Sequence, residues 1–170
     1  MRPTVKLLID TGQIYQRISE LAYIISTTFR FENKPVLFLG VLDECFMFLS
    51  ELVKRVVLPN VEVQFVKVQK TKTEPELLLP LPNVTDKIVV IVNGLTDTDT
   101  ELSYLCNKLS ELNPATIRVC SLLCRNELQT IPVHVHFCGF EVSAEHVVGF
   151  GLSSRGMYGN LNAIFQYIGD

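Results

Sequence analysis

The stretch VVIVNGLTDTDTEL, residues 89–102, indicates how this chain folds. Four apolar residues come first, then Asn93 and Gly94, and then a loop rich in Asp, Thr and Glu. A short run of β-branched residues that ends in such a loop is typical of a buried strand leading into a helix. Loops of this kind often hold a phosphate, because a helix N-terminus presents unpaired N–H groups. This loop, however, carries three acids and no glycine after Gly94.

Strand patterns and helix patterns alternate along the rest of the chain. PVLFLGVL, from Pro35, and TIRVCSLL, from Thr116, have the composition of buried strands. A capping box, DTGQ, opens a helix pattern at Asp10, and another helix pattern begins at Glu101. Because the central strands are apolar almost throughout, the sequence predicts an α/β fold with a central, mainly parallel sheet flanked by helices. We expect a single domain over residues 1–170, since this length suits one core.

The composition excludes some classes of function. Hydrophobic residues make up 48% of the 170 residues and charged residues 19%, with a mean hydropathy of +0.28. Such an apolar excess predicts a large core or a face reserved for a protein partner. The net charge of -3 and the pI near 5.6 give no reason to expect a nucleic-acid-binding protein. No apolar run reaches the length of a membrane span.

The cysteines predict an intracellular protein. The five residues are scattered through apolar segments and form no C-x-x-C pair; they are Cys45, Cys106, Cys120, Cys124 and Cys138. An odd number of such residues is typical of reduced, buried thiols rather than of a disulfide framework. We therefore expect an intracellular location, either cytoplasmic or mitochondrial.

Three segments, in this order, resemble the hypoxanthine-guanine phosphoribosyltransferase family. They are FLGVLDECFMFLSELVKRV (residues 38–56), KIVVIVNGLTDTDTEL (87–102) and FCGFEVSAEHVVGFGL (137–152). The resemblance extends from about Leu7 to the C-terminus, and it implies a type I phosphoribosyltransferase fold. It implies less about the reaction, because function belongs to the site rather than to the fold.

The resemblance implies that the loop after residue 92 would bind phosphoribosyl diphosphate. In the family an acidic pair holds the ribose hydroxyls, directly or through magnesium. An Asp-Thr dipeptide follows, whose aspartate is the proposed general base, and then a glycine and a threonine bind the 5'-phosphate. In the same order, these positions are here Asn93, Gly94, Asp97, Thr98, Asp99 and Glu101. Each carboxylate facing a phosphate there costs on the order of a few kcal/mol, so the sequence predicts a vestigial phosphate loop.

The loop that would bind pyrophosphate departs from the family in the same direction. The family's Lys-Gly pair corresponds to Asp43 and Glu44, so a cation has become an anion. Ala144 stands where the resemblance implies a metal-binding aspartate, and Ser153 stands where it implies another aspartate. Gly159 replaces an arginine that reaches the pyrophosphate, and the Ser-Tyr pair of the family's flexible lid is absent.

The purine side of the site is better preserved. Arg125 aligns with a lysine that reads the exocyclic oxygen of the purine, and it can still donate hydrogen bonds. Phe137 aligns with the aromatic residue that stacks on the purine. In simpler interpretations Phe137 belongs to the core and Arg125 is solvated.

Other polar residues also have more than one interpretation. Asp97 is interpreted as a helix N-cap rather than as a surviving base. The acids of the two loops either hold a divalent cation or, as favoured here, are solvated carboxylates near a helix N-terminus. His134, His136 and Cys138 share one strand face and are candidate zinc ligands, although no fourth ligand is evident.

These departures favour a catalytically inactive relative, kept as a structural or accessory subunit of a larger assembly. Its partners would be proteins, in a homo- or hetero-oligomer, and no cofactor is expected. One alternative is a regulatory partner of an active purine phosphoribosyltransferase. Another is a hypoxanthine or guanine phosphoribosyltransferase with a divergent site, serving purine salvage. Only an active enzyme would require Mg²⁺.

Overall fold

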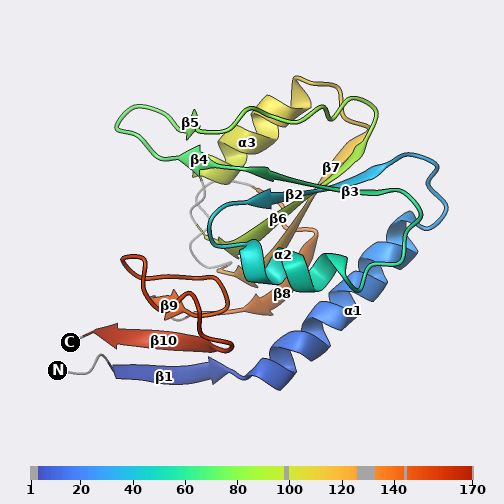
Figure 1. The fold of residues 1–170 in the computed structure, drawn as a ribbon. Helices are drawn as coiled ribbons and strands as arrows, with labels where there is room; N and C mark the ends of the chain where they lie inside the picture. The colour runs from blue at the N-terminus through green and yellow to red at the C-terminus, as the bar shows by residue number, and fades with distance from the viewer. Residues whose placement is uncertain (1–3, 98–99, 126–132, 144, 170) are drawn as a thin grey trace.

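A computed structural model describes residues 4–97, 100–125, 133–143 and 145–169. Its central element is a five-stranded parallel sheet with the strand order β3-β2-β6-β7-β8, which confirms the predicted α/β fold (Figure 1). The strands are β2 (Val36–Val41), β3 (Val61–Val66), β6 (Ile88–Thr96), β7 (Thr116–Cys124) and β8 (Phe137–Glu141). The helices are α1 (Thr11–Phe29), α2 (Phe46–Val53) and α3 (Thr100–Ser110). Within the described ranges, no helix is long and apolar enough to cross a membrane.

Alternate side chains of the sheet face two different layers of helices. Val90 and Val92 of β6 belong to the core cluster that includes α1 and α2, whereas Val89 and Ile91 belong to the cluster that includes α3. Figure 1 shows α3 on the opposite side of the sheet from α1 and α2. All four β6 side chains are fully buried. A strand buried on both faces is apolar throughout, which explains the run KIVVIV.

The two ends of the chain pair with each other in a separate small sheet. β1 (Thr4–Ile9) runs antiparallel to β10 (Ile164–Gly169), and β10 also pairs with β9 (Val147–Val148). Figure 1 shows this small antiparallel sheet on the α1 side of the main sheet. The sequence patterns did not predict β10, because its side chains are mostly half-buried and show no clean alternation.

A short hairpin follows β3. β4 (Val68–Gln69) pairs antiparallel with β5 (Glu76–Leu77), which lies in the proline-containing stretch 70–83. β8 begins at Phe137, so residues 133–136 come before the strand.

Two of the cysteines do not behave as predicted. Cys124 of β7 and Cys138 of β8 form a disulfide, with their Cα atoms 6.4 Å apart. The prediction of five reduced thiols is wrong for this pair, because adjacent strands bring the two residues within bonding range. Cys45, Cys106 and Cys120 are free. Burial raises the pKa of Cys45 to about 12 and that of Cys106 to about 11, so both thiols stay protonated.

The start of α1 offers a test of local stability. Asp10 accepts a hydrogen bond from the Gln13 N–H at 2.9 Å, and the Gln13 side chain accepts one from the Asp10 N–H at 3.0 Å, which confirms the capping box. We expect Asp10→Ala to lower the free energy of unfolding by about 1 kcal/mol, because a helix N–H group loses its acceptor. Urea denaturation measures this change. The exposed Gln16 serves as control: Gln16→Ala should stay within about 0.5 kcal/mol of wild type. Equal losses in both variants would contradict the role of the cap.

Candidate active site

The loops that follow β2, β6 and β7 meet at one edge of the parallel sheet. β6 pairs in parallel with β2 on one side and with β7 on the other, so the carboxyl ends of all three strands are neighbours. Ligands bind at this edge in open α/β sheets. The β2 and β6 loops touch: a Cβ added at Gly94 would lie 3.0 Å from the Cβ of Glu44. The segments that the resemblance assigned to one site thus lie together at this edge.

An ion pair joins the ends of β6 and β7. Thr96 lies opposite Cys124 in the register of these strands, so the next residues, Asp97 and Arg125, come side by side. Arg125 Nη1 lies 3.2 Å from Asp97 Oδ2, and Arg125 Nη2 donates a hydrogen bond to the carbonyl of Glu145. The Arg125 side chain is 10% exposed and that of Asp97 is 29% exposed. Arg125 is therefore a buried member of the site, and the solvated interpretation is wrong.

The Asp97 carboxylate faces Arg125, and α3 begins at Thr100. The N-cap interpretation of Asp97 stays a prediction, because residues 98 and 99 lie outside the described parts of the chain. The Nε atom of Arg125 is buried and has no hydrogen-bond partner among the described residues. Because a buried N–H without an acceptor costs free energy, a ligand that brings an acceptor to this atom would be stabilised.

The Asn93 side chain is held within the last residues of β6. Its Nδ2 donates hydrogen bonds to the Leu95 carbonyl at 2.9 Å and to the Thr96 hydroxyl at 3.1 Å. The Thr96 hydroxyl donates in turn to the Ser121 hydroxyl of β7 at 3.0 Å. Asn93, Thr96 and Ser121 are all buried. Both hydrogens of the Asn93 amide are thus used inside the protein, and Thr96 carries the connection to β7.

The loop after β2 carries two acids, and a cation from the end of β3 lies beside it. Lys67 lies 2.8 Å from Asp43, in a pair whose side chains are 38% and 76% exposed. Such an exposed pair adds little stability, but it sets a positive charge beside Asp43. Glu44 is in no salt bridge among the described residues. Desolvation raises the pKa of Glu44, and the negative charges of Asp97 and Asp43 raise it further.

The two residues that were expected to contact a purine have different surroundings. Phe137 is only 8% exposed, and its ring packs edge-on against Phe29 at 6.4 Å between centroids, as the core interpretation predicted. Arg125 instead donates a hydrogen bond to the carbonyl of Glu145. The next residue, His146, is exposed. The contact of Arg125 with Glu145 was not predicted, because no local pattern indicates a contact across 20 residues.

The remaining predicted positions are more dispersed. Glu101 accepts a hydrogen bond from the Thr100 hydroxyl in the first turn of α3. Ser153 is exposed, and the Gly159 carbonyl accepts a hydrogen bond from the Gly151 N–H. Three predicted positions lie outside the described residues: Thr98, Asp99 and Ala144.

The structure gives no support to a metal site built from protein ligands alone. No group of three potential ligands gathers in the described parts of the chain. Cys138 is bonded to Cys124, and the Nδ1 atom of His136 accepts a hydrogen bond from the Val119 N–H at 3.1 Å. Burial is the main cause that lowers the pKa of His136 to about 4. The zinc interpretation is therefore wrong for His136 and Cys138.

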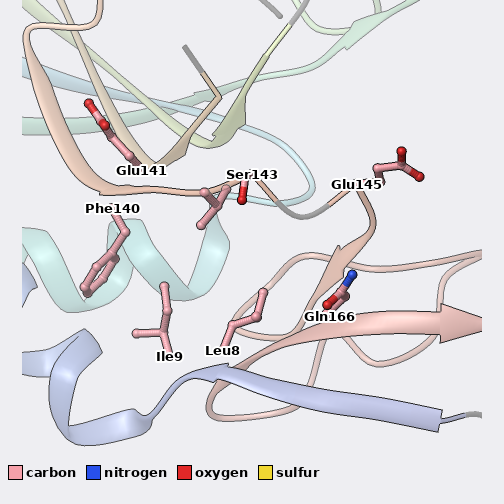
Figure 2. A pocket seen from close by; sticks show the side chains of 8 residues that line it. Leu8, Ile9, Phe140, Glu141, Ser143, Glu145 and Gln166 are labelled. Carbon is pink, nitrogen blue, oxygen red and sulfur yellow. The ribbon is translucent and has the colours of Figure 1, made fainter. Parts of the chain in front are cut away.

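A cavity borders the site, between the small antiparallel sheet and the end of β8. Its volume is about 610 Å³, and it is lined by Leu8, Ile9, Phe140, Glu141, Val142, Ser143, Glu145 and Gln166. Figure 2 shows Phe140 pointing from β8 toward Ile9 of β1, whereas Glu141 points away from them. Glu145 connects the cavity to the site, because its carbonyl accepts the hydrogen bond from Arg125.

Known proteins similar to this chain are phosphoribosyltransferases. The family model described as phosphoribosyl transferase domain matches residues 5–155. A hypoxanthine-guanine phosphoribosyltransferase of Lactococcus lactis is 31% identical over 92% of this chain and 87% of its own length. A hypoxanthine phosphoribosyltransferase of Salmonella typhimurium is 29% identical over 95% of this chain and 94% of its own length. The fold matches a crystal structure of a hypoxanthine-guanine phosphoribosyltransferase from Bacillus anthracis with a TM-score of 0.91 at 24% identity, covering 99% of this chain and 100% of that chain.

These relatives overturn the expectation of a catalytically inactive structural subunit, because proteins that match nearly full length are named as phosphoribosyltransferases. The estimate of repulsion treated the acids as bare charges, whereas Asp97 is paired with Arg125 and Asp43 with Lys67. A paired carboxylate repels a phosphate less than a bare one, so these two acids oppose a phosphate less than a count of acids in the sequence suggests. Partners, Mg²⁺ and cellular location stay predictions. The chain belongs to the phosphoribosyltransferase family and, within it, to the hypoxanthine-guanine phosphoribosyltransferases with their type I fold.

Proposed function

We propose that this protein transfers the phosphoribosyl group of phosphoribosyl diphosphate to hypoxanthine or guanine. A ring nitrogen of the purine forms a bond to C1 of the ribose, the bond from C1 to the pyrophosphate oxygen breaks, and the ring nitrogen loses its proton. The observation that carries the proposal is the Asp97–Arg125 pair at the adjacent ends of β6 and β7. One member of this pair can accept a proton, and the other donates hydrogen bonds.

Arg125 suits a purine that carries an exocyclic oxygen. Its guanidinium is a planar set of N–H donors and has no acceptor. Asp97 and the Glu145 carbonyl bind two of its nitrogens, and this fixes the plane of the guanidinium. The third nitrogen, Nε, has no partner among the described residues. The exocyclic oxygen of hypoxanthine or guanine can accept from such a donor. The exocyclic amino group of adenine is itself a donor, and it would leave the buried N–H unpaired.

Asp97 is the proposed general base. Arg125 holds its carboxylate at the end of β6, the central strand of the site, so the carboxylate is oriented before the substrates bind. A positioned carboxylate that removes a proton in the transition state contributes about 100-fold to 10,000-fold to the rate. The role that sequence analysis treated as vestigial thus becomes the central one.

Mg²⁺ is the proposed cofactor, brought by the diphosphate. This ion keeps several waters and binds through one or two carboxylates together with substrate phosphates. The described residues fit this mode, since single acids border the site and no group of three ligands is present among them. When bound, Mg²⁺ neutralises charge on the pyrophosphate that leaves. Lys67, which follows β3, offers a further positive charge beside Asp43.

The activity itself is the first prediction of this proposal. Purified protein supplied with hypoxanthine or guanine, phosphoribosyl diphosphate and Mg²⁺ should form a nucleoside 5'-monophosphate and pyrophosphate in equal amounts. We expect Asp97→Asn to lower kcat by about 100-fold to 10,000-fold, because the amide keeps the shape of the side chain but does not take the proton.

Absorbance of the purine product measures this rate, with Glu74→Gln as the control. Glu74 is exposed between β4 and β5, and its replacement should leave kcat within about twofold. Failure of the wild-type protein to form nucleotide from either purine would refute the proposed function.

Arg125 should determine the choice of purine. We expect Arg125→Met to raise the KM for hypoxanthine by about 10- to 100-fold, because a charged donor is lost. The preference for hypoxanthine over adenine, measured as the ratio of kcat/KM, should fall by a similar factor. Arg125→Lys keeps a charged donor, so its KM for hypoxanthine and its preference for hypoxanthine should change less than those of Arg125→Met. This comparison separates an effect on purine recognition from an effect on folding. An unchanged preference in Arg125→Met would remove Arg125 from this role.

A further inference from the structure

Glu44 packs against a glycine at the end of the neighbouring strand. A Cβ added at Gly94 would lie 3.0 Å from the Cβ of Glu44 and 3.0 Å from its carbonyl oxygen. A Cβ added at Gly151 would lie 2.5 Å from the same carbonyl oxygen. Side chains do not tolerate such distances without a shift, so the two glycines keep open the space that Glu44 occupies. A side chain at position 44 therefore competes for space with one at position 94.

Glu44 differs from the other described polar residues of the site in having no close partner among them. Asp97 lies 3.2 Å from Arg125, and Asp43 lies 2.8 Å from Lys67. The amide of Asn93 is used inside its own loop. Glu44 forms neither a salt bridge nor a side-chain hydrogen bond with any described residue. Its carboxylate therefore lies at the end of β6 with no hydrogen-bond donor among the described side chains.

The surroundings of Glu44 favour neutral hydrogen-bond donors as its ligand. Its carboxyl is partly desolvated and lies near the negative charges of Asp97 and Asp43, so donors that stabilise the anion are favourable. A divalent cation held by the protein would need several oxygen ligands, and no group of three exists among the described residues. Two adjacent sugar hydroxyls, in contrast, offer two donors that the two oxygens of one carboxylate can accept.

We propose that the Glu44 carboxylate binds the 2- and 3-hydroxyl groups of the ribose in phosphoribosyl diphosphate. The identity of the sugar rests on the proposed function, and the choice of residue rests on the Glu44–Gly94 contact. In this role Glu44 contacts the substrate and holds it, but it takes no part in making or breaking bonds. It holds the sugar on the β2 side of Asp97, while Arg125 lies on the β7 side.

The first test compares two sugars that differ in one hydroxyl. Calorimetry gives the dissociation constants of ribose 5-phosphate and 2-deoxyribose 5-phosphate. We expect wild type to prefer the ribose by about 10-fold or more, and Glu44→Ala to bind both sugars within about threefold of each other. The two sugars are compared within each variant, so a general effect of the substitution on the fold cancels. Glu74→Ala is the matched control and should keep the full preference.

The second test moves the carboxylate across the contact. Gly94→Asp alone should weaken binding of ribose 5-phosphate, because its Cβ would meet Glu44 at 3.0 Å. The double variant Gly94→Asp/Glu44→Gly removes the contact with the Glu44 Cβ. It again has one carboxylate at this end of β6, now carried by position 94. We expect the double variant to recover a preference for ribose that Glu44→Gly alone lacks. A double variant with no such preference would overturn the assignment of this place to the ribose.

Turnover serves as a separate readout. In an active enzyme, Glu44→Ala should raise the KM for phosphoribosyl diphosphate by about 10-fold or more and leave the KM for hypoxanthine within about twofold. If wild type forms no nucleotide but prefers ribose 5-phosphate, the proposed function fails and the assignment of Glu44 stands. If Glu44→Ala keeps the full preference, or wild type binds neither sugar or both equally, the assignment is overturned whatever the activity.

Discussion

The parallel pairing of β6 with β7 is the constraint on which the rest of the site depends. This register sets Thr96 opposite Cys124, and it therefore brings Asp97 beside Arg125 one residue later. The hydrogen bond from Thr96 to Ser121 holds the same two strands together below the ion pair. A shift by one residue would exchange the two faces of a strand that is buried on both. The packing of the core thus fixes the position of the charged pair.

Charges in this site act in pairs, and a count of acids from the sequence overestimates their repulsion. Asp43 and Asp97 look like uncompensated anions in the sequence, but Lys67 and Arg125 approach them from other strands. Neither pairing is local, since 24 residues separate Lys67 from Asp43 and 28 separate Arg125 from Asp97. At short range the partner's charge cancels most of the field that a distant phosphate would meet. Electrostatic inference from a linear motif therefore needs the neighbouring strands.

The sequence predicted those parts of the fold that depend on local pattern. The capping box at Asp10 and the doubly buried run of β6 are recognisable because their physical causes lie within a few residues. The small antiparallel sheet was not predicted, because β1 and β10 come from opposite ends of the chain. The same limit applies to the site. Its segments were identified correctly, but the contact of Glu44 with Gly94 depends on the strand order.

Two polar groups near Asp97 lack partners in the described structure, and the strand order separates them. The Nε atom of Arg125 lies at the end of β7, and Glu44 follows β2, with β6 and Asp97 between them. One group needs an acceptor and the other needs donors, so they suit different parts of one ligand. A purine oxygen at Arg125 and sugar hydroxyls at Glu44 would set the bond between purine and ribose near the Asp97 carboxylate. A base is useful at that junction, because the ring nitrogen loses its proton there as the bond forms.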